Sequence, residues 1–158
     1  RMDYWLDRVD NHDRVVIPGD GQNLWHRAYA PDVGSALRVV AEAGEPGEFY
    51  NVGDQRAVTL EEMLDLIADA MDTDIEVVTA GEHELAAAGL APEDFVLYRE
   101  YPHILDTNKL ADLGWESTGL EDAMARTVEE HRDSDRDGEE YDPGRENEEA
   151  VLDVLDTL

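Results

Sequence analysis

Hydrophobic positions change between strand-like and helix-like spacing along residues 1–131. Trp5, Leu6 and Val9 share one face of a helix expected over residues 1–12, and a short β-branched run follows at 14–17. Further helices are expected at 32–43, 59–71, 82–88, 106–113 and 119–131, and further strands at 24–30, 48–52 and 75–79. Strands that alternate with helices predict an α/β fold.

Three of these helices begin at residues that can accept a hydrogen bond from a free backbone amide. Thr59 and Glu62 have the spacing of a capping box, in which each side chain accepts from the backbone amide of the other residue. Asp32 is predicted to cap the helix that carries Val33, Ala36, Leu37 and Val40 on its inner face. Asp106 is predicted to cap a short helix that contains Leu110 and Leu113 and stops at Gly114.

The composition changes after His131. The run "RDSDRDGEEYDPGRENEE" is charged and contains glycine and proline, and "AVLDVLDTL" follows it with apolar residues at helical spacing. We therefore divide the chain into a ligand domain at 1–131 and an acidic linker with a terminal helix at 132–158. The helix is expected to dock on the domain, and the alternative is a frayed tail.

The net charge of −28 is the strongest indication in the composition of the environment in which the protein works. Asp and Glu number 40 against 12 Lys and Arg, and Lys109 is the single lysine. Such a surface suits a salt-loaded cytoplasm in a halophilic source, because concentrated salt screens carboxylate repulsion. The alternative is a disordered acidic chain, which the regular apolar spacing argues against. The charge also opposes nucleic-acid binding at low salt. No apolar run is long enough to cross a membrane, so no membrane partner is expected.

Sequence signatures of catalysis are few. The chain has no G-x-G-x-x-G, no P-loop and no cysteine. Its three serines lack the context of a nucleophile, and its five histidines lack the spacing of a metal site. Acidic residues are so frequent that no pair stands out as a general acid and base. We therefore assign no catalytic residue and no metal ligand. Because the chain begins with Arg1, we expect it to be a fragment or a processed product.

Three polar residues remain as candidates for ligand binding. Arg27 lies on an expected strand just before a helix start, where a guanidinium and helix amides could together bind a phosphate. Arg99 lies in the aromatic-rich "VLYREYPH", which could stack on a base or a sugar. Asn51 follows Tyr50 at the end of an expected strand. From spacing alone, a surface ion pair, a packed strand and a turn residue explain the three as well.

Three stretches occur in the order typical of one family: "PGDGQNLWHRAYAPDVGSAL", "GEFYNVGDQRAVTLEEMLDLIADAM" and "YPHILDTNKLADLGWEST". Residues 1–131 resemble the carboxyl-terminal, substrate-side part of extended short-chain dehydrogenases, the NAD-dependent epimerases and dehydratases of nucleotide sugars. The resemblance implies a Rossmann-type fold without its dinucleotide-binding half. It also implies that Arg27 contacts the nucleotide diphosphate, with Arg99 as a second phosphate ligand. Asp106 and Lys109 match a closing motif whose role is helix capping and packing.

A narrower likeness is carried by residues 56–60, "RAVTL", and residues 113–117, "LGWES". These stretches resemble the chloroplast stem-loop RNA-binding proteins, atypical members linked to mRNA binding and endoribonuclease activity. The main interpretation is therefore an mRNA-binding or RNA-processing protein on this scaffold. The alternative is a nucleotide-sugar epimerase or dehydratase, and a third reading is an interaction domain without a ligand.

The family's glycine-rich turn and its Tyr-x-x-x-Lys pair are absent from this chain. No cofactor is therefore expected in the chain itself, and NAD(P) is expected only in a full-length protein. The expected partners are an amino-terminal Rossmann half, RNA or a nucleotide sugar, and a second copy that pairs through Phe49 to Val52. The expected location is the cytoplasm.

Overall fold

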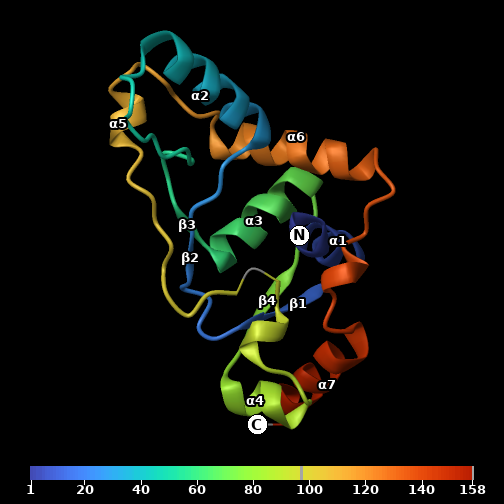
Figure 1. Cartoon of the computed structure of the whole chain (residues 1–158). Helices are drawn as coiled ribbons and strands as arrows, with labels where there is room; N and C mark the ends of the chain where they lie inside the picture. Colours follow the sequence, from blue (N-terminus) through green and yellow to red (C-terminus); the bar gives the residue numbers. More distant parts are fainter. Residues whose placement is uncertain (97, 158) are drawn as a thin grey trace.

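The centre of the molecule is a pair of parallel strands, β1 (Arg14–Pro18) and β4 (Glu76–Ala80), in a computed structural model that describes residues 1–96 and 98–157. The register runs from Arg14 opposite Glu76 to Pro18 opposite Ala80. Figure 1 shows the pair between α1 and α3 on one side and α4 and α7 on the other. Val15, Val16 and Ile17 are consecutive and all fully buried, as expected where helices cover both faces of a parallel sheet.

Three helices form the layer above this sheet. They are α1 (Met2–Asn11), α3 (Leu60–Met71) and α6 (Leu120–Arg132). The predicted inner faces are confirmed, and the buried residues are Trp5, Leu6 and Val9 on α1 and Met63, Leu64, Ile67 and Met71 on α3. The other face is covered by α4 (Glu82–Ala87) and by α7 (Arg145–Asp156), and single turns of 3-10 helix lie at Pro92–Asp94 and Glu139–Tyr141. The predicted α/β fold is confirmed.

The predicted capping box at the start of α3 is present. Thr59 Oγ1 accepts from the Glu62 amide at 3.1 Å, and Glu62 Oε2 accepts from the Thr59 amide at 2.8 Å. Just before it, β3 (Val58–Thr59) pairs antiparallel with β2 (Leu24–Trp25). The pairing places the capped start of α3 directly beside Leu24 and Trp25.

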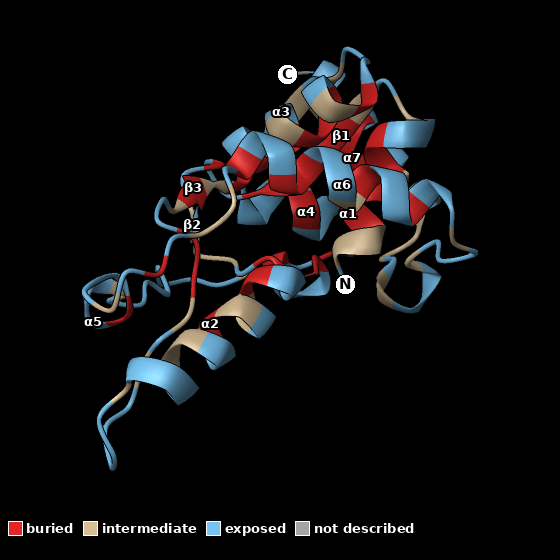
Figure 2. Ribbon diagram, turned by 90° about the horizontal axis from the view of Figure 1, so that it is seen from above, coloured by how far each residue is buried: buried red, intermediate tan, exposed pale blue. Residues whose placement is uncertain are grey.

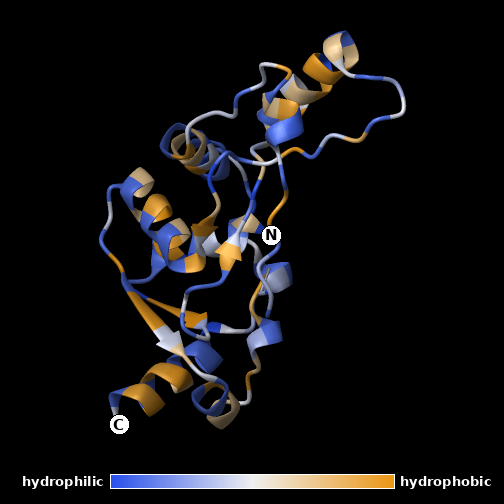
Figure 3. Ribbon diagram, turned by 90° about the vertical axis from the view of Figure 1, so that its left-hand side faces the viewer, coloured by the Kyte–Doolittle hydropathy of each residue, from blue (hydrophilic) through white to orange (hydrophobic). Residues whose placement is uncertain are grey.

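A second, smaller apolar cluster holds an arm, which we define as α2 (Ala30–Ala43) and residues 44–53. Ala36 of α2 packs with Leu110 of α5 (Asn108–Ala111) and with Trp115, and Tyr50 and Val52 lie against them. Trp115 Nε1 donates to Ser35 Oγ at 2.9 Å. Figure 2 shows the arm extending away from the main body, and Figure 3 shows hydrophobic residues along α2 within it.

Two predicted helix caps are placed differently. The helix predicted from Asp32 begins at Ala30, because Pro31 fits its first turn. The Asp32 carboxylate instead accepts from the Thr118 amide at 2.8 Å and from Thr118 Oγ1 at 2.7 Å, which joins α2 to the segment before α6. Asp106 Oδ1 accepts from the Asn108 amide at 3.0 Å, but the residue at the cap position of α5 is Thr107.

Two predicted strands are shorter or absent. The strand predicted at 24–30 is limited to Leu24–Trp25, and residues 48–52 form no strand among the described residues. Tyr50 and Val52 face the small cluster while Phe49 is 90% exposed, so the alternation of a strand is kept without a pairing partner. Leu37, predicted to face inward, is 65% exposed because α2 projects from the body.

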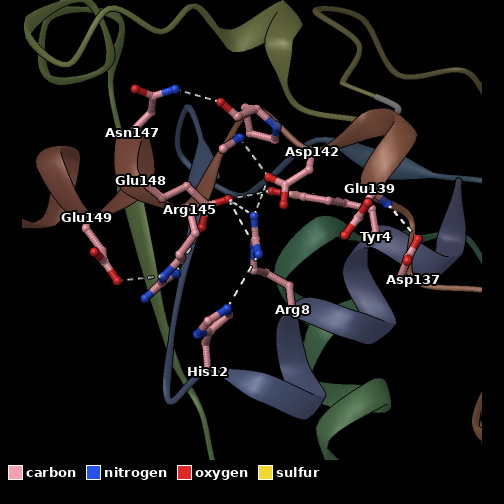
Figure 4. A network of polar contacts seen from close by, with 12 residues as sticks. Tyr4, Arg8, His12, Asp137, Glu139, Asp142, Arg145, Asn147, Glu148 and Glu149 are labelled. Atoms are coloured by element: carbon pink, nitrogen blue, oxygen red, sulfur yellow. Dashed lines mark hydrogen bonds and ion pairs between the residues drawn. The ribbon is translucent and has the colours of Figure 1, made fainter.

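The terminal helix is docked, as expected. Val151 and Leu152 of α7 are buried in the main core, and Figure 4 shows the polar network beside them. Residue 158, at the end of the expected terminal helix, lies outside the described residues. So does residue 97, in the aromatic-rich stretch around Arg99. No helix in the described part of the chain is long and apolar enough to cross a membrane.

Candidate functional site

The candidate site is a cleft of about 190 Å³ between β2 and the loop of residues 98–107, which we call the ligand cleft. It is lined by Met2, Leu24, Trp25, His26, Arg27, Arg99 and His103. None of these residues is acidic, although 40 of the 158 residues are Asp or Glu. Two arginines beside an apolar floor therefore form a local site for an anion.

Arg27 is held firmly at this cleft. Its side chain is 11% exposed, and its Nε lies 3.3 Å from Asp54 Oδ2. Its Nη1 contacts Met124 Sδ at 3.8 Å, and its backbone carbonyl accepts from the Asp54 amide at 2.8 Å. The ion-pair alternative from the sequence is thus present, but its partner is a buried acid rather than one of the surface acids.

Asp54 is an unusual carboxylate for this surface-acidic chain. Its side chain is 1% exposed, and neither carboxylate oxygen has a hydrogen-bond partner among the described residues. Burial raises the pKa of Asp54, the Arg27 charge opposes that rise, and the nearby Asp32 adds to it. Arg27 is therefore the main charge that compensates Asp54, and the two residues hold each other in place.

Arg99 is brought to the same cleft from a distant part of the sequence. It is exposed, and Nη1 donates only to the neighbouring Tyr98 carbonyl, at 3.0 Å, among the described contacts. It also borders a wider cleft of about 620 Å³ between residues 89–99 and 140–147. The Arg99 guanidinium can therefore turn toward a ligand in either cleft, whereas the Arg27 guanidinium is held by Asp54.

His26 links three segments at the edge of the ligand cleft. Its Nδ1 lies 2.9 Å from the Leu105 amide nitrogen, and its Nε2 lies 2.6 Å from the Asp54 carbonyl oxygen. The ring also lies against Gly53, where a Cβ atom would be 2.7 Å from Nε2. His26 stands between β2 and Arg27 in the chain. Its ring therefore ties the loop that carries Arg99 to β2 and to Asp54.

Asn51 and Lys109 lie outside the ligand cleft. Asn51 Nδ2 donates to the Asp106 carbonyl at 3.0 Å, which ties the arm to the loop before α5. Lys109 pairs with Glu48 and lies over the Tyr50 ring at 5.6 Å. Their hydrogen bond raises the pKa of Lys109 and lowers that of Glu48. Here both side chains hold the arm in place, and a ligand role for Asn51 stays a prediction.

Sequence reasoning missed Trp25, His26, His103 and Asp54. Trp25 and His26 stand directly before Arg27 in "NLWHRAY", so a search for polar and aromatic side chains near that arginine could have found both. Asp54 could not be distinguished from the many other acids, because its burial depends on tertiary packing. No group of three potential metal ligands occurs in the part of the chain that the structure describes.

Comparison with curated proteins finds similarity to a sugar-nucleotide enzyme and to a glycan-biosynthesis protein. It is 31% identical over 122 residues to a trifunctional UDP-glucose 4,6-dehydratase, epimerase and reductase of Arabidopsis thaliana, which covers 73% of this chain and 16% of that protein. It is 26% identical over 130 residues to the low-salt glycan biosynthesis protein Agl12 of Haloferax volcanii, covering 79% of this chain and 37% of that one. No family model matches the chain.

Solved structures of larger proteins share the fold of this chain. UDP-glucose 4-epimerase from Thermotoga maritima, solved with UDP-glucose, superposes with a TM-score of 0.61 at 27% identity over 82% of this chain and 38% of the enzyme. RMD from Pseudomonas aeruginosa, solved with NADPH, has a TM-score of 0.62 at 17% identity over 84% of this chain and 41% of that one, and shows the fold alone. The chain has the fold of one part of these larger Rossmann-type proteins.

The homologues are members of the NAD-dependent epimerase/dehydratase family, as the broader resemblance predicted. The chain spans well under half the length of the relatives and structures named above. The mRNA-binding interpretation receives no support from them. The halophilic source likewise stays a prediction.

Proposed function

We propose that this chain supplies the phosphate-binding side of the substrate site in an NAD(P)-dependent epimerase or dehydratase of nucleotide sugars. The observation that carries the proposal is the ligand cleft, where Arg27 and Arg99 converge and no carboxylate lines the wall. A diphosphate matches the forked donors of two guanidinium groups. The apolar floor made by Leu24 and Trp25 suits the less polar part of such a ligand.

The residues present do not fit a dinucleotide cofactor. β1 is followed by a turn and β2 rather than by a helix, so it forms no strand–turn–helix phosphate site. β4 does lead into α4 through Gly81, but the Glu84 carboxylate lies 2.8 Å from where a Gly81 Cβ would be. A pyrophosphate there would meet that negative charge. NAD(P) and the reacting groups therefore belong to an amino-terminal Rossmann half, which is the partner we propose for this chain.

The RNA-binding interpretation is less well supported than this one. The relatives named above are described as sugar-nucleotide enzymes or as a glycan-biosynthesis protein. A net charge of −28 opposes an RNA backbone unless salt screens it. A cleft of about 190 Å³ offers room for a diphosphate and a ring, and extended contact along a strand of RNA would have to form elsewhere.

The test is calorimetry of the 158-residue chain with UDP-glucose, with a short single-stranded RNA as a second ligand. Arg99→Gln is the main variant, since Arg27→Ala would leave the buried Asp54 without its opposite charge. We expect Arg99→Gln to weaken UDP-glucose binding about tenfold or more, the range for hydrogen bonds to a charged group. The matched control is Arg38→Gln, because Arg38 is 71% exposed on the arm and pairs only loosely with Glu42.

Equal affinity of the Arg99→Gln and parent chains for UDP-glucose would contradict the assignment. So would the absence of UDP-glucose binding at millimolar ligand. RNA binding that depends on Arg99 while UDP-glucose fails to bind would favour the RNA interpretation instead.

A further inference from the structure

We propose that His26 is a positioning residue for the ligand cleft, which it organises only as a neutral imidazole with its proton on Nε2. In that form it fixes the loop of residues 98–107, which carries Arg99 and His103, beside Arg27. A second proton on the ring releases the loop and weakens binding of an anionic ligand. The part of this inference that concerns a ligand rests on the proposed function, and the part that concerns the loop does not.

The tautomer follows from the two partners of the ring. Leu105 offers a backbone N–H at 2.9 Å, which can only donate, so Nδ1 must accept and carries no proton. Asp54 offers a backbone carbonyl at 2.6 Å, which can only accept, so Nε2 must carry the proton. Neither backbone group can exchange donor for acceptor by rotating. The arrangement therefore admits one protonation state of His26.

The ring has little freedom to move within this arrangement. A Cβ atom at position 53 would lie 2.7 Å from Nε2, 3.0 Å from Cε1 and 3.2 Å from Cδ2, so Gly53 lies directly against the imidazole. His26 also follows Trp25, which is paired in β2. Both the backbone and the ring of His26 are thus held, so the lone pair on Nδ1 has a fixed direction.

The middle of the loop, residues 99–105, is held by this one hydrogen bond, while Tyr98 packs against the main core at one end and Asn51 Nδ2 donates to the Asp106 carbonyl at the other. Between Arg99 and Leu105, the hydrogen bond to His26 is the only one to another segment that the structure describes. Tyr101 is 73% exposed and Ile104 is 48% exposed, so packing adds little to hold these residues. The hydrogen bond at Leu105 therefore sets the course of residues 99–105, which include Arg99 and His103, between these two held ends.

Protonation of Nδ1 would place a second N–H against the Leu105 N–H. The ring then has to turn, which Gly53 and Asp54 oppose, or the loop has to leave. The charged and titratable groups around His26 on the neighbouring segments are Arg27, Arg99, His103, Asp54 and Asp106. The two arginines repel a positive imidazole, whereas the Asp54 carboxylate, which is paired with Arg27, attracts it. The geometry therefore predicts that acidification favours release of the loop.

The first experiment needs no ligand. In the parent chain at about pH 8 we expect NMR of the ring nitrogens to show His26 as the Nε2–H tautomer, and the Leu105 amide to exchange slowly. Lowering the pH to about 5.5 should speed Leu105 exchange by about fivefold or more beyond the change at exposed amides. The Nδ1–H tautomer, or a Leu105 amide as fast as an exposed one at pH 8, would overturn the inference.

The second experiment measures binding of UDP-glucose in a His103→Gln chain, because His103 is a second imidazole that lines the same cleft. Affinity should fall about fivefold or more from about pH 8 to about pH 5.5. The matched variant is His26→Asn, whose side-chain oxygen can replace Nδ1 as acceptor but takes no proton. It should bind within about threefold of its parent at pH 8 and lose the pH dependence.

A pH dependence that survives in His26→Asn would overturn the positioning role. Absence of UDP-glucose binding at every pH, with the Nε2–H tautomer and Leu105 protection both observed, would refute the proposed function and leave the control of the loop by His26 intact.

Discussion

Glu148 of α7 accepts a hydrogen bond of 2.8 Å from the hydroxyl of Tyr4 on α1, and its side chain is completely buried. The same carboxylate accepts from Arg8 Nε at 3.0 Å and from Arg145 Nη1 at 3.0 Å (Figure 4). Burial raises the pKa of Tyr4, and the Glu148 charge raises it further. Burial lowers the pKa of Arg8, but Glu148, Tyr4 and Asp142 more than offset this and leave it raised.

We expect Glu148→Gln to destabilise the whole chain strongly. The change removes the fully buried one of the two carboxylates that pair with Arg8 and leaves the less buried Asp142, and removing one partner of a buried pair costs about 3–5 kcal/mol. The measurement is urea unfolding followed by circular dichroism. The control is Glu149→Gln, because Glu149 is adjacent in sequence, also contacts Arg145 and is 62% exposed, so its loss should cost about 0.5 kcal/mol or less. Equal stability of the two variants would contradict the structural role of the network.

Gly53→Ala should destabilise the chain and disturb the His26 ring. The added Cβ would lie 2.7 Å from Nε2, and overpacking of this kind costs about 1–3 kcal/mol. The matched control is Gly34→Ala on α2, where a Cβ meets nothing within 4 Å and should stabilise the helix by about 0.5–1 kcal/mol. Thermal unfolding distinguishes the two, since the melting temperatures should move in opposite directions. A rise for Gly53→Ala would show that the ring is not confined there.

His12 should make stability depend on pH. Burial lowers the pKa of His12 below its ordinary value of 6.5, and the charges of Arg145 and Arg8 lower it further. The unfolded chain therefore takes up this proton first, so the folded state loses the contribution of His12 as the pH falls below 6.5.

The test compares unfolding free energies of the parent chain and His12→Asn at about pH 7.5 and about pH 5.5, in the same salt. The parent chain should lose more stability than His12→Asn over this interval, and the difference isolates His12 from other titrating groups. A larger loss of stability in His12→Asn than in the parent chain would contradict the prediction.

Local signals in the sequence predicted those parts of the fold that depend on neighbouring residues. The capping box of Thr59 and Glu62 needs two side chains three positions apart, and the buried face of α3 needs only helical spacing. Asp32 misled the prediction because Pro31 can also begin a helix, and the carboxylate found a distant donor in Thr118.

The candidate site was predicted only in part because its members come together through tertiary packing. Arg27 and Arg99 were both identified, but they line one cleft only because residues 98–107 fold back beside β2, and contacts such as that of Leu105 with His26 have no local signature. Glu148 looked like one more acid in a charged segment, and only the docking of α7 on α1 makes it a buried partner of Arg8. Residues 48–52 have strand spacing but find no pairing partner among the described residues.

Salt should stabilise the chain. Its 40 Asp and Glu residues against 12 Lys and Arg repel one another over a range that shrinks from about 10 Å at 0.1 M salt to about 3 Å at 1 M. We expect the melting temperature, followed by circular dichroism, to rise from about 0.1 M to about 2 M KCl. The buried pair of Arg8 and Glu148 is shielded from salt, so Glu148→Gln should show the same rise from a lower starting point. A melting temperature that falls over this range would show that exposed ion pairs outweigh the repulsion.

The arm should mediate self-association of this chain, and salt should strengthen it. Phe49 is 90% exposed and Leu37 is 65% exposed, while residues 48–52 keep the alternation of a strand without a pairing partner in the described structure. An exposed, extended segment with apolar side chains tends to pair with another edge, and a two-fold dimer is the commonest arrangement. Because the net charge of −28 makes two copies repel each other, screening by salt should favour the dimer, whereas a contact made of ion pairs would weaken in salt.

Sedimentation at tens of micromolar protein in about 0.2 M and about 2 M salt measures this self-association. Phe49→Ser should reduce the dimer at high salt, while Arg38→Gln, an exposed change on the same arm, should not. A monomer at both salt concentrations would contradict the predicted self-association. A dimer unaffected by Phe49→Ser would show that the two copies do not meet through the arm.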